Sequence, residues 1–265
     1  MSRFRDDAAD QLIDHLRRLD DPIEFAAAGS VSGRAWIAGL PALIFATCLK
    51  WNLEIENGVA NNGYHAIVLP VRRDGEPYAL KLSWPTDRIV DEVIALRAWN
   101  GNGAVQLVNA DADLGVILME RLDPLRTLRS LNLTDAAGVA GRLLRQLAVP
   151  APPGLRQLTD LVRELTQSFR QRQECHGHPI PNIWLDAACS HCQRLEEVTN
   201  NTFLVYADLH YGNIVAGNRA TWLAIDPKPI AGDPEHAVPE LLWRRANEIE
   251  HAEGIRRLLT VIVES

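Results

Sequence analysis

One stretch of the chain, residues 203–230, restricts the possible folds more than any other part. It begins with the apolar run Phe203–Tyr206, which has the length and composition of a buried strand. Two further short apolar segments follow, Ile214–Ala216 and Trp222–Ile225, and the turn signal Gly217-Asn218 separates them. We therefore predict a buried strand followed by a β-hairpin.

Three oxygen-bearing side chains are expected to gather at the open end of this hairpin. Pairing about the turn would place Asn213 beside Asp226, and Asp208 lies one loop away. Carboxylate and amide oxygens are ligands that Mg²⁺ prefers, and a carboxylate that holds no metal can take a proton from an attacking hydroxyl. Phosphoryl transfer requires these parts, because it depends mainly on positioning and charge neutralisation.

The amino-acid sequence of this stretch also resembles that of a known family. The segments A-D-L-H-Y-G-N at 207–213 and I-D-P-K-P at 225–229 are similar to signatures of the aminoglycoside phosphotransferase family. Within that family they look most like the aminoglycoside/hydroxyurea antibiotic resistance kinases, the streptomycin 6-kinase-like branch. The resemblance covers residues 40–250 and implies an α+β, bilobal protein-kinase-like fold, with a small antiparallel-sheet N-lobe and a mainly helical C-lobe. The alternative is a surface hairpin that carries Asp and Asn because turns favour them.

The resemblance implies a role for each polar residue of the stretch. Asp208 would be the catalytic base, and Asn213 and Asp226 would hold Mg²⁺. His210 is expected to hydrogen-bond the backbone instead of taking part in the chemistry. Lys228 could reach a phosphate oxygen, or it could simply be solvated at the end of a strand.

A lysine interrupts an otherwise apolar predicted strand, Pro77–Leu82. Burying the unpaired ammonium group of Lys81 would be costly, so we expect a partner on the following helix. Asp91 and Glu92 are both candidates there, and the resemblance of the segment that begins at Glu92 to the family favours Glu92. Such a pair binds the ATP phosphates in kinases; the alternative is an edge lysine whose head reaches water.

Two further segments are candidates for nucleotide binding. Gly58 and Gly63 lie in an Asn-rich turn between two predicted strands, the layout of a nucleotide-covering loop whose N–H groups approach phosphates. The same glycines could equally belong to an ordinary turn. Glu120 lies in a segment that leads to Asp123-Pro124, where we expect a hinge between lobes whose backbone hydrogen-bonds adenine.

The predicted domains are an N-terminal helical extension (1–40), an N-lobe (41–120) and a C-lobe (121–265) of the 265-residue chain. The net charge of −7 argues against a nucleic-acid partner, and it weakly favours a cationic substrate. The longest apolar run, Ala35–Leu49, is broken by Gly39 and Pro41, so we expect it to be too short to span a bilayer.

The cysteines favour a reducing compartment. The chain has four cysteines without a secreted-type framework and begins with a charged segment instead of a secretory signal, so we predict a cytoplasmic protein. Zinc would accept the ligand types of a Cys/His cluster between Cys175 and Cys192. The spacing of that cluster, however, fits none of the usual paired zinc patterns.

We therefore predict an ATP- and Mg²⁺-dependent phosphotransferase that acts on a hydroxyl of a small molecule, of the streptomycin/aminoglycoside or hydroxyurea type, in antibiotic resistance or secondary metabolism. A protein-substrate kinase is disfavoured, because H-R-D, D-F-G and A-P-E segments are missing.

The alternative is a catalytically impaired, truncated kinase-like protein that binds nucleotide. Ala207 stands where the family usually has Gly, and a left-handed backbone there would strain an alanine. Ala237 stands where relatives typically have Asp, and the chain ends at Ser265, earlier than the resemblance leads us to expect.

Overall fold

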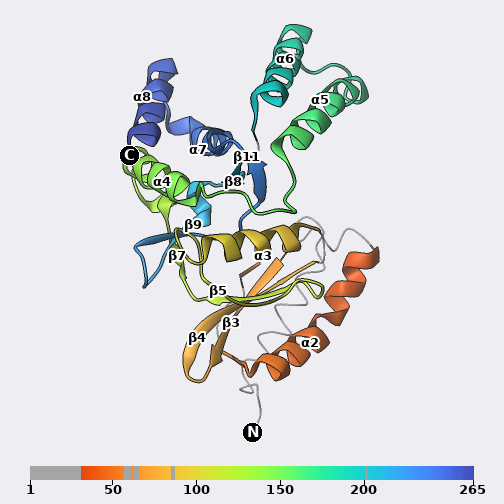
Figure 1. Ribbon diagram of the computed structural model, residues 1–265, viewed down its shortest axis with the longest axis vertical. Coiled ribbons are helices and arrows are strands. Elements are labelled where there is room, and N and C mark those ends of the chain that lie inside the picture. The colour runs from red at the N-terminus through yellow and green to blue at the C-terminus, as the bar shows by residue number, and fades with distance from the viewer. Residues whose placement is uncertain (1–30, 57–60, 63–65, 85–86, 201) are drawn as a thin grey trace. The chain divides into compact units, whose positions relative to one another are not determined.

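The computed structural model describes residues 31–265 except 57–60, 63–65, 85–86 and 201 (Figure 1). The predicted N-terminal helical extension falls largely outside this range, and so do Gly58 and Gly63. The chain forms two compact units. The first unit contains the described residues up to Leu96 together with Val105–Asp123 and Gly217–Arg219, and the second unit contains Arg97–Ala104, Pro124–Ala216 and Ala220–Ser265.

An antiparallel sheet is the centre of the first unit. Its strand order is β1-β3-β4-β6-β5, with β2 also paired to β3. The strands are β1 (Glu54–Ile55), β2 (Asn61–Asn62), β3 (Ala66–Arg73), β4 (Glu76–Ser83), β5 (Leu107–Asp111) and β6 (Val116–Glu120). Asp74 and Gly75 connect β3 to β4, both with positive φ (54° and 85°), as a two-residue Asp-Gly hairpin turn requires.

Helix α2 (Val31–Trp51) packs against this sheet. Ile37, Leu40, Ile44 and Cys48 lie on one side of it and share a core with the buried residues of β3 and β4. The expected domain boundary at residue 40 falls inside α2. Apolar residues of α2 are buried on both sides of Pro41. Their burial offsets the free-energy cost of the backbone hydrogen bond that this proline cannot donate.

The expectation that the apolar run is too short to cross a membrane is also corrected. The 20 residues Ser32–Trp51 are long and apolar enough for a span by length and composition. However, 33% of the most apolar window is buried within the protein, and Leu40, Ile44 and Cys48 are completely buried. This packing is typical of a core helix that covers a sheet.

Helix α3 (Asp87–Trp99) follows β4 and presents an apolar stripe. Ile89, Val93 and Leu96 are all buried along it. The helix ends before Asn100-Gly101, where both residues have positive φ (45° and 79°).

The second unit combines small sheets with most of the helices. The strands are β7 (Asp123–Thr127), β8 (Phe203–Tyr206), β9 (Ile214–Ala216), β10 (Trp222–Ala224) and β11 (Pro229–Gly232), paired in the orders β10-β9-β7 and β11-β8. The helices are α4 (Leu133–Leu147), α5 (Leu158–Cys175), α6 (Asn182–Val198), α7 (Val238–Trp243) and α8 (His251–Glu264). Short 3₁₀ turns are η2 (Leu128–Ser130), η3 (Tyr211–Asn213), η4 (Pro234–Ala237) and η5 (Ala246–Glu248).

The predicted strand at 203–206 coincides with β8, and the two predicted hairpin segments form β9 and β10. The helices α5 and α6 lie side by side as a helical hairpin, and α4 packs against α8 (Figure 1).

Candidate active site

The β9–β10 hairpin brings Asn213 and Asp226 to its open end, with a register that differs slightly from the prediction. Ala224 pairs with Ile214, and the Ile225 N–H donates to the Asn213 carbonyl at 2.9 Å. Asn213 therefore lies opposite Ile225, and Asp226 is the next residue along the chain. The predicted hairpin is confirmed, with an offset of one residue in the pair.

Asp226 has a backbone conformation that the sequence did not reveal. Its φ is 55°, in the left-handed region that is uncommon for residues other than glycine, and its side chain is exposed. The hydroxyl of Tyr206 donates to the Asp226 carbonyl at 2.9 Å and also to the carbonyl of Ile225. Tyr206 is buried in β8, so a rigid strand holds the strained residue in place. The sequence pattern assigned Tyr206 only to an apolar run and gave no sign of this role.

The loop between β8 and β9 is held by its own side chains. His210 Nδ1 accepts from the Gly212 N–H at 3.1 Å and caps η3, as expected of this histidine from the sequence. Asn213 Nδ2 donates to the Asp208 carbonyl at 3.4 Å. Because the amide nitrogen is used in this way, the amide oxygen of Asn213 is the atom that could bind a metal.

The two alanine substitutions that raised the possibility of an impaired enzyme cause no strain here. Ala207 is not among the residues with positive φ, and its N–H donates to the Lys228 carbonyl at 3.1 Å. The conformational cost considered for this alanine therefore does not arise. Ala237 is fully buried in an apolar cluster with Leu158 and Val205, where an aspartate would need a partner of its own.

Each oxygen of the Asp208 carboxylate contacts a different cation. Lys228 Nζ forms an ion pair with Oδ2, and Arg244 Nη2 lies 3.4 Å from Oδ1. Arg244 also pairs with Glu240, through Nε at 2.9 Å. Lys228, which was expected either at a phosphate or in solvent, is about half exposed and contacts the predicted base. Arg244 was missed, because an exposed arginine on a helix end carries no pattern that indicates a site.

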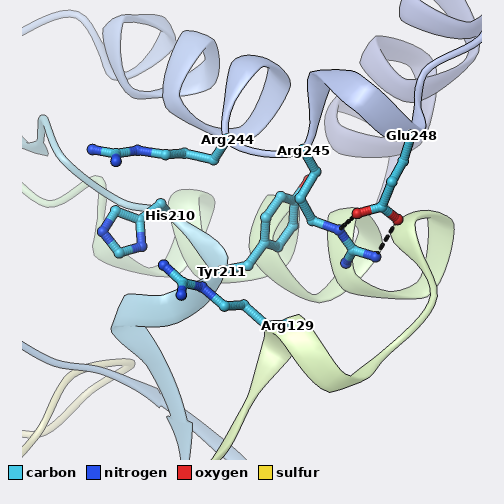
Figure 2. Close-up of a pocket in the computed structure, with 6 residues that line it drawn as sticks. All are labelled: Arg129, His210, Tyr211, Arg244, Arg245 and Glu248. Carbon is cyan, nitrogen blue, oxygen red and sulfur yellow. Dashed lines mark hydrogen bonds and ion pairs between the residues drawn. The ribbon is translucent and has the colours of Figure 1, made fainter.

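A cavity of about 370 Å³ adjoins this carboxylate within the second unit. It is lined by Arg129, His210, Tyr211, Arg244, Arg245 and Glu248 (Figure 2). Burial, together with the positive charges of Arg244 and Arg129, lowers the pKa of His210 despite the nearby Asp208 carboxylate. The imidazole is therefore neutral at pH 7.

Tyr211 and Arg245 form a fixed wall of this cavity. The guanidinium of Arg245 lies over the Tyr211 ring, 5.3 Å from its centroid, and donates two hydrogen bonds of 2.6 Å to Glu248. Burial raises the pKa of Tyr211 to about 12, so its hydroxyl stays protonated. Arg245 is held in one position, because two of its N–H groups bind the two oxygens of Glu248 and the carboxylate balances its charge.

In the first unit, the predicted ion pair between Lys81 and Glu92 forms. Lys81 Nζ on β4 lies 2.7 Å and 2.8 Å from the two carboxylate oxygens of Glu92 on α3. Both side chains are only 7% exposed. A buried ammonium requires such a partner, which is the reason that the strand pattern was informative. Asp91, the other candidate, is not the residue that takes this position.

Glu120, predicted to lie in the nucleotide-binding segment, has its side chain occupied within the first unit. Its carboxylate accepts from the Gln106 N–H at 2.7 Å and pairs with Arg219 at 2.7 Å. The Glu120 side chain therefore connects the end of β6 to Gln106 and to Arg219. Only the backbone of this segment remains a candidate for adenine, in line with the expectation from the sequence.

Across the described part of the chain, no group of three or more His, Cys, Asp or Glu side chains could hold a metal ion. Cys189 is buried, Cys192 is partly buried and Cys175 is exposed. A magnesium site of one carboxylate and one amide oxygen, completed by phosphate oxygens, needs no such group.

Comparison with known proteins identifies the family. The model of the aminoglycoside/hydroxyurea antibiotic resistance kinases matches residues 50–265. The chain belongs to this family. It is 37% identical over 260 residues to streptomycin 6-kinase of Streptomyces griseus, covering 95% of this chain and 84% of that protein. It is also 38% identical over 236 residues to hydroxyurea phosphotransferase of Kitasatospora aureofaciens, covering 83% and 68%.

Solved structures of this kinase class share the fold. A thermostable mutant of an aminoglycoside phosphotransferase, in a complex with ADP and hygromycin B, has a TM-score of 0.56 at 14% identity, covering 82% of this chain and 83% of that one. A choline kinase of Streptococcus pneumoniae has a TM-score of 0.54 at 13% identity, covering 84% and 80%. The predicted protein-kinase-like α+β fold and the predicted enzyme class, a small-molecule kinase, are confirmed.

Proposed function

We propose that this kinase transfers the γ-phosphoryl group of ATP to a hydroxyl of a small molecule, with Mg²⁺ as cofactor. The observation that carries the proposal is the convergence of Asp208, Asn213 and Asp226 at the end of the β9–β10 hairpin. On this proposal Lys81 and Glu92 are nucleotide-binding residues, and Asp208 is the catalytic base.

The acceptor is inferred from the relatives. Proteins similar over most of the chain are named for streptomycin and for hydroxyurea, so we propose a hydroxyl of this type and a role in antibiotic resistance or secondary metabolism. We place the enzyme in the cytoplasm, without a nucleic-acid or membrane partner.

The donor set fits magnesium. Asp226 offers an exposed carboxylate and Asn213 an amide oxygen, both hard ligands, and the left-handed backbone held by Tyr206 keeps Asp226 in one position. When bound, Mg²⁺ would neutralise the charge of the phosphate oxygens. Lys81, oriented by two hydrogen bonds to Glu92, would neutralise further phosphate charge.

Asp208 would accept the proton of the acceptor hydroxyl. Its two oxygens are both contacted by cations, Lys228 and Arg244, and both of these side chains are about half exposed. Exposed ion pairs of this kind are weak, so an incoming hydroxyl can displace one of the cations at little cost. The released cation would then be available to a phosphate oxygen.

The test is release of ADP in the presence of Mg²⁺ and a panel of acceptors: streptomycin, hydroxyurea and simple sugars. Asp208→Asn should reduce turnover on the accepted substrate by on the order of 10²–10⁴-fold. Asp186→Asn is the matched control, because Asp186 is an exposed aspartate of α6 that pairs with Arg170 of α5. Unchanged turnover in the Asp208 variant would remove this residue from the proposed role.

A second outcome corresponds to the impaired, nucleotide-binding alternative. Thermal stabilisation by Mg·ATP without ADP release from any acceptor would favour it. The relaxed backbone at Ala207 speaks for the active enzyme.

A further inference from the structure

The loop that joins Asp208 to Asn213 must hold two functional groups at a fixed separation, yet the hydrogen bond that links them directly is weak. Asn213 Nδ2 donates to the Asp208 carbonyl at 3.4 Å, which is longer than an ordinary N–H···O bond. The other bonds of this turn are local, from the Gly212 N–H to His210 Nδ1 at 3.1 Å and from the Asn213 N–H to the His210 carbonyl at 2.8 Å. A fixed geometry therefore depends on contacts from outside the loop.

Arg129 supplies one such contact by packing flat against the loop at Gly212. A Cβ atom at Gly212 would lie 2.8 Å from Nε, 2.8 Å from Nη2 and 2.9 Å from Cζ of Arg129. An edge-on approach would leave Cζ farther away than the two nitrogens, so the planar guanidinium presents its face to the glycine. Gly212 does not have a positive φ, so its missing side chain serves the approach of Arg129 and not the turn.

The backbone that carries Arg129 is itself well fixed. Arg129 lies in η2, which follows β7, and β7 is paired with β9, the strand that begins directly after Asn213. The neighbouring Leu128 is completely buried, and the Arg129 N–H donates to the Thr127 hydroxyl at 3.3 Å. The η2 turn also packs against η3. The sheet that carries Asn213 thus also holds the base of the Arg129 side chain.

Arg245 supplies a second contact, to the residue before Gly212. Its guanidinium lies over the buried Tyr211 ring, and one N–H group donates to the Leu131 carbonyl at 3.0 Å. The two bonds of 2.6 Å to Glu248 fix the guanidinium in this place. Leu131 directly follows η2, so Arg245 joins the loop to the turn that also carries Arg129.

We propose that Arg129 and Arg245 are positioning residues that hold η3 and thereby fix Asn213 relative to Asp208. Figure 2 shows the two side chains, with Arg245 beside the Tyr211 ring. The inference rests on the proposed function, because the separation matters for the reaction only if Asp208 is the base and Asn213 binds Mg²⁺. A misplacement of about 1 Å can cost about 10²-fold in rate. Arg129 and Arg245 then line the cavity because they support this loop, independently of the charge of the acceptor.

Amide hydrogen exchange of the full chain tests the Arg129 contact without metal, nucleotide or turnover. In Arg129→Gln, the amides of Gly212 and Asn213 should lose protection by about tenfold, because the loop opens more often, as measured by NMR. The amides of β4 should keep their wild-type rates. Arg126→Gln is the matched control, because Arg126 is exposed on β7 and gives the same change in charge. Equal protection of the two loop amides in the wild type and in Arg129→Gln would overturn the proposal.

Two further variants show whether the planar contact is responsible. Arg129→Lys keeps the positive charge but has no planar group, so it should lose as much protection as Arg129→Gln. Gly212→Ala removes the contact from the other side, since the methyl group would displace the guanidinium. The double variant Arg129→Gln, Gly212→Ala should protect the Asn213 amide no less than the weaker of the two single variants, because both remove the same contact. Wild-type protection in Arg129→Lys, or additive losses in the double variant, would contradict the proposed contact.

Arg245→Lys tests the second support. Lysine cannot reproduce the fork that binds both oxygens of Glu248 while lying over the Tyr211 ring, so protection of the Asn213 amide should fall by about tenfold. Arg256→Lys is the matched control, because Arg256 also pairs with a glutamate three residues away, Glu253, on the exposed surface of α8. An unchanged Asn213 amide in Arg245→Lys would reject the role of Arg245.

Kinetics on the accepted substrate distinguish positioning from contact with the acceptor. In Arg129→Gln, kcat should fall by about tenfold and the Mg²⁺ concentration for half-maximal rate should rise by a similar factor. The KM for the acceptor should stay within about twofold of the wild-type value, since the acceptor is not what Arg129 holds. A raised acceptor KM with wild-type kcat and Mg²⁺ dependence would assign Arg129 to acceptor binding and reject its positioning role.

The outcomes separate the two proposals. Loss of loop protection in Arg129→Gln, without ADP release by the wild type from any acceptor, would reject the proposed function and retain the support of the loop. ADP release that is lost in Asp208→Asn, with wild-type turnover and wild-type protection in Arg129→Gln, would retain the function and reject the support by Arg129.

Discussion

The two units each contain a contact between a carboxylate and a cation, but the contacts are of different kinds. In the first unit, Lys81 and Glu92 are both only 7% exposed and are joined by two short hydrogen bonds. In the second unit, Asp208 is 15% exposed, and its partners Lys228 and Arg244 are 51% and 48% exposed. The same chemical groups therefore form a buried, permanent pair in one unit and solvent-exposed, exchangeable contacts in the other.

Burial explains the difference. A buried charge that loses its partner cannot recover its hydration, so the Lys81–Glu92 pair is retained whether or not a ligand is present. The cations on Asp208 remain in contact with water and lose little when they leave. For the proposed roles, a residue that only orients a phosphate would benefit from the first arrangement, and a general base that must exchange partners would benefit from the second.

The largest expected effect is on the buried pair. Glu92→Gln should lower the free energy of unfolding by about 3–5 kcal/mol, because it leaves the Lys81 ammonium buried without a counter-charge. Urea denaturation measures this loss. The double variant Lys81→Met, Glu92→Leu should recover most of the stability without recovering ADP release. A loss below about 1 kcal/mol for Glu92→Gln would mean that the pair is as exchangeable as the contacts of Asp208.

A smaller loss is expected at Tyr206, which supports the proposed metal-binding residue Asp226. Tyr206→Phe removes the donor to the carbonyls of Ile225 and Asp226 and should cost about 1–3 kcal/mol of unfolding free energy. Turnover should also fall, because the left-handed backbone of Asp226 loses its support. Tyr78→Phe is the control, since the Tyr78 ring lies under Arg73 and that contact does not depend on a hydroxyl. Wild-type activity in Tyr206→Phe would show that Asp226 is positioned by other contacts.

The exposed contacts should contribute least to stability. Asp208→Asn should change the free energy of unfolding by no more than about 1 kcal/mol, although the same variant loses most of its activity. The small change should shrink further at high salt, because exposed charges are screened. Denaturation at low and high salt, next to Glu92→Gln, gives the direct comparison. A loss at Asp208 as large as that at Glu92, and independent of salt, would contradict it.

The smallest expected effect is the pH dependence that His210 contributes. Burial and the neighbouring arginines lower the pKa of His210 in the folded protein, so the unfolded chain binds the proton more readily. The free energy of unfolding should therefore fall as the pH is lowered below 6.5, the ordinary value for histidine, until the folded-state pKa is passed.

His210→Asn should reduce this decline without abolishing the fold, because the new amide oxygen can still accept from the Gly212 N–H. His176→Gln, at an exposed site after α5, is the control. An identical decline in His210→Asn and in the wild type would assign the pH dependence to another group.

Local chemistry in the sequence determined much of the fold and of the site. The apolar run of β8 and the turn after β9 specify a strand and a hairpin, because a short continuous apolar run and a Gly-Asn turn act over a few residues. The sequence likewise predicted the Lys81–Glu92 pair, since a lysine in a buried strand requires a counter-charge nearby. The residues around Asp208, Asn213 and Asp226 are enough by themselves to indicate the family.

Only the tertiary structure decided how these residues are surrounded. The carbonyl of Asp226, which has a left-handed backbone, accepts from a hydroxyl 20 residues earlier in the chain, and the contact of Arg244 with Asp208 spans 36 residues. Arg129 owes its place to the missing side chain of Gly212. Exposed arginines follow neither a helix or strand periodicity nor a turn preference. The local sequence therefore does not indicate which of them will face a cavity. That depends on how distant segments pack, which is the information that a linear pattern lacks.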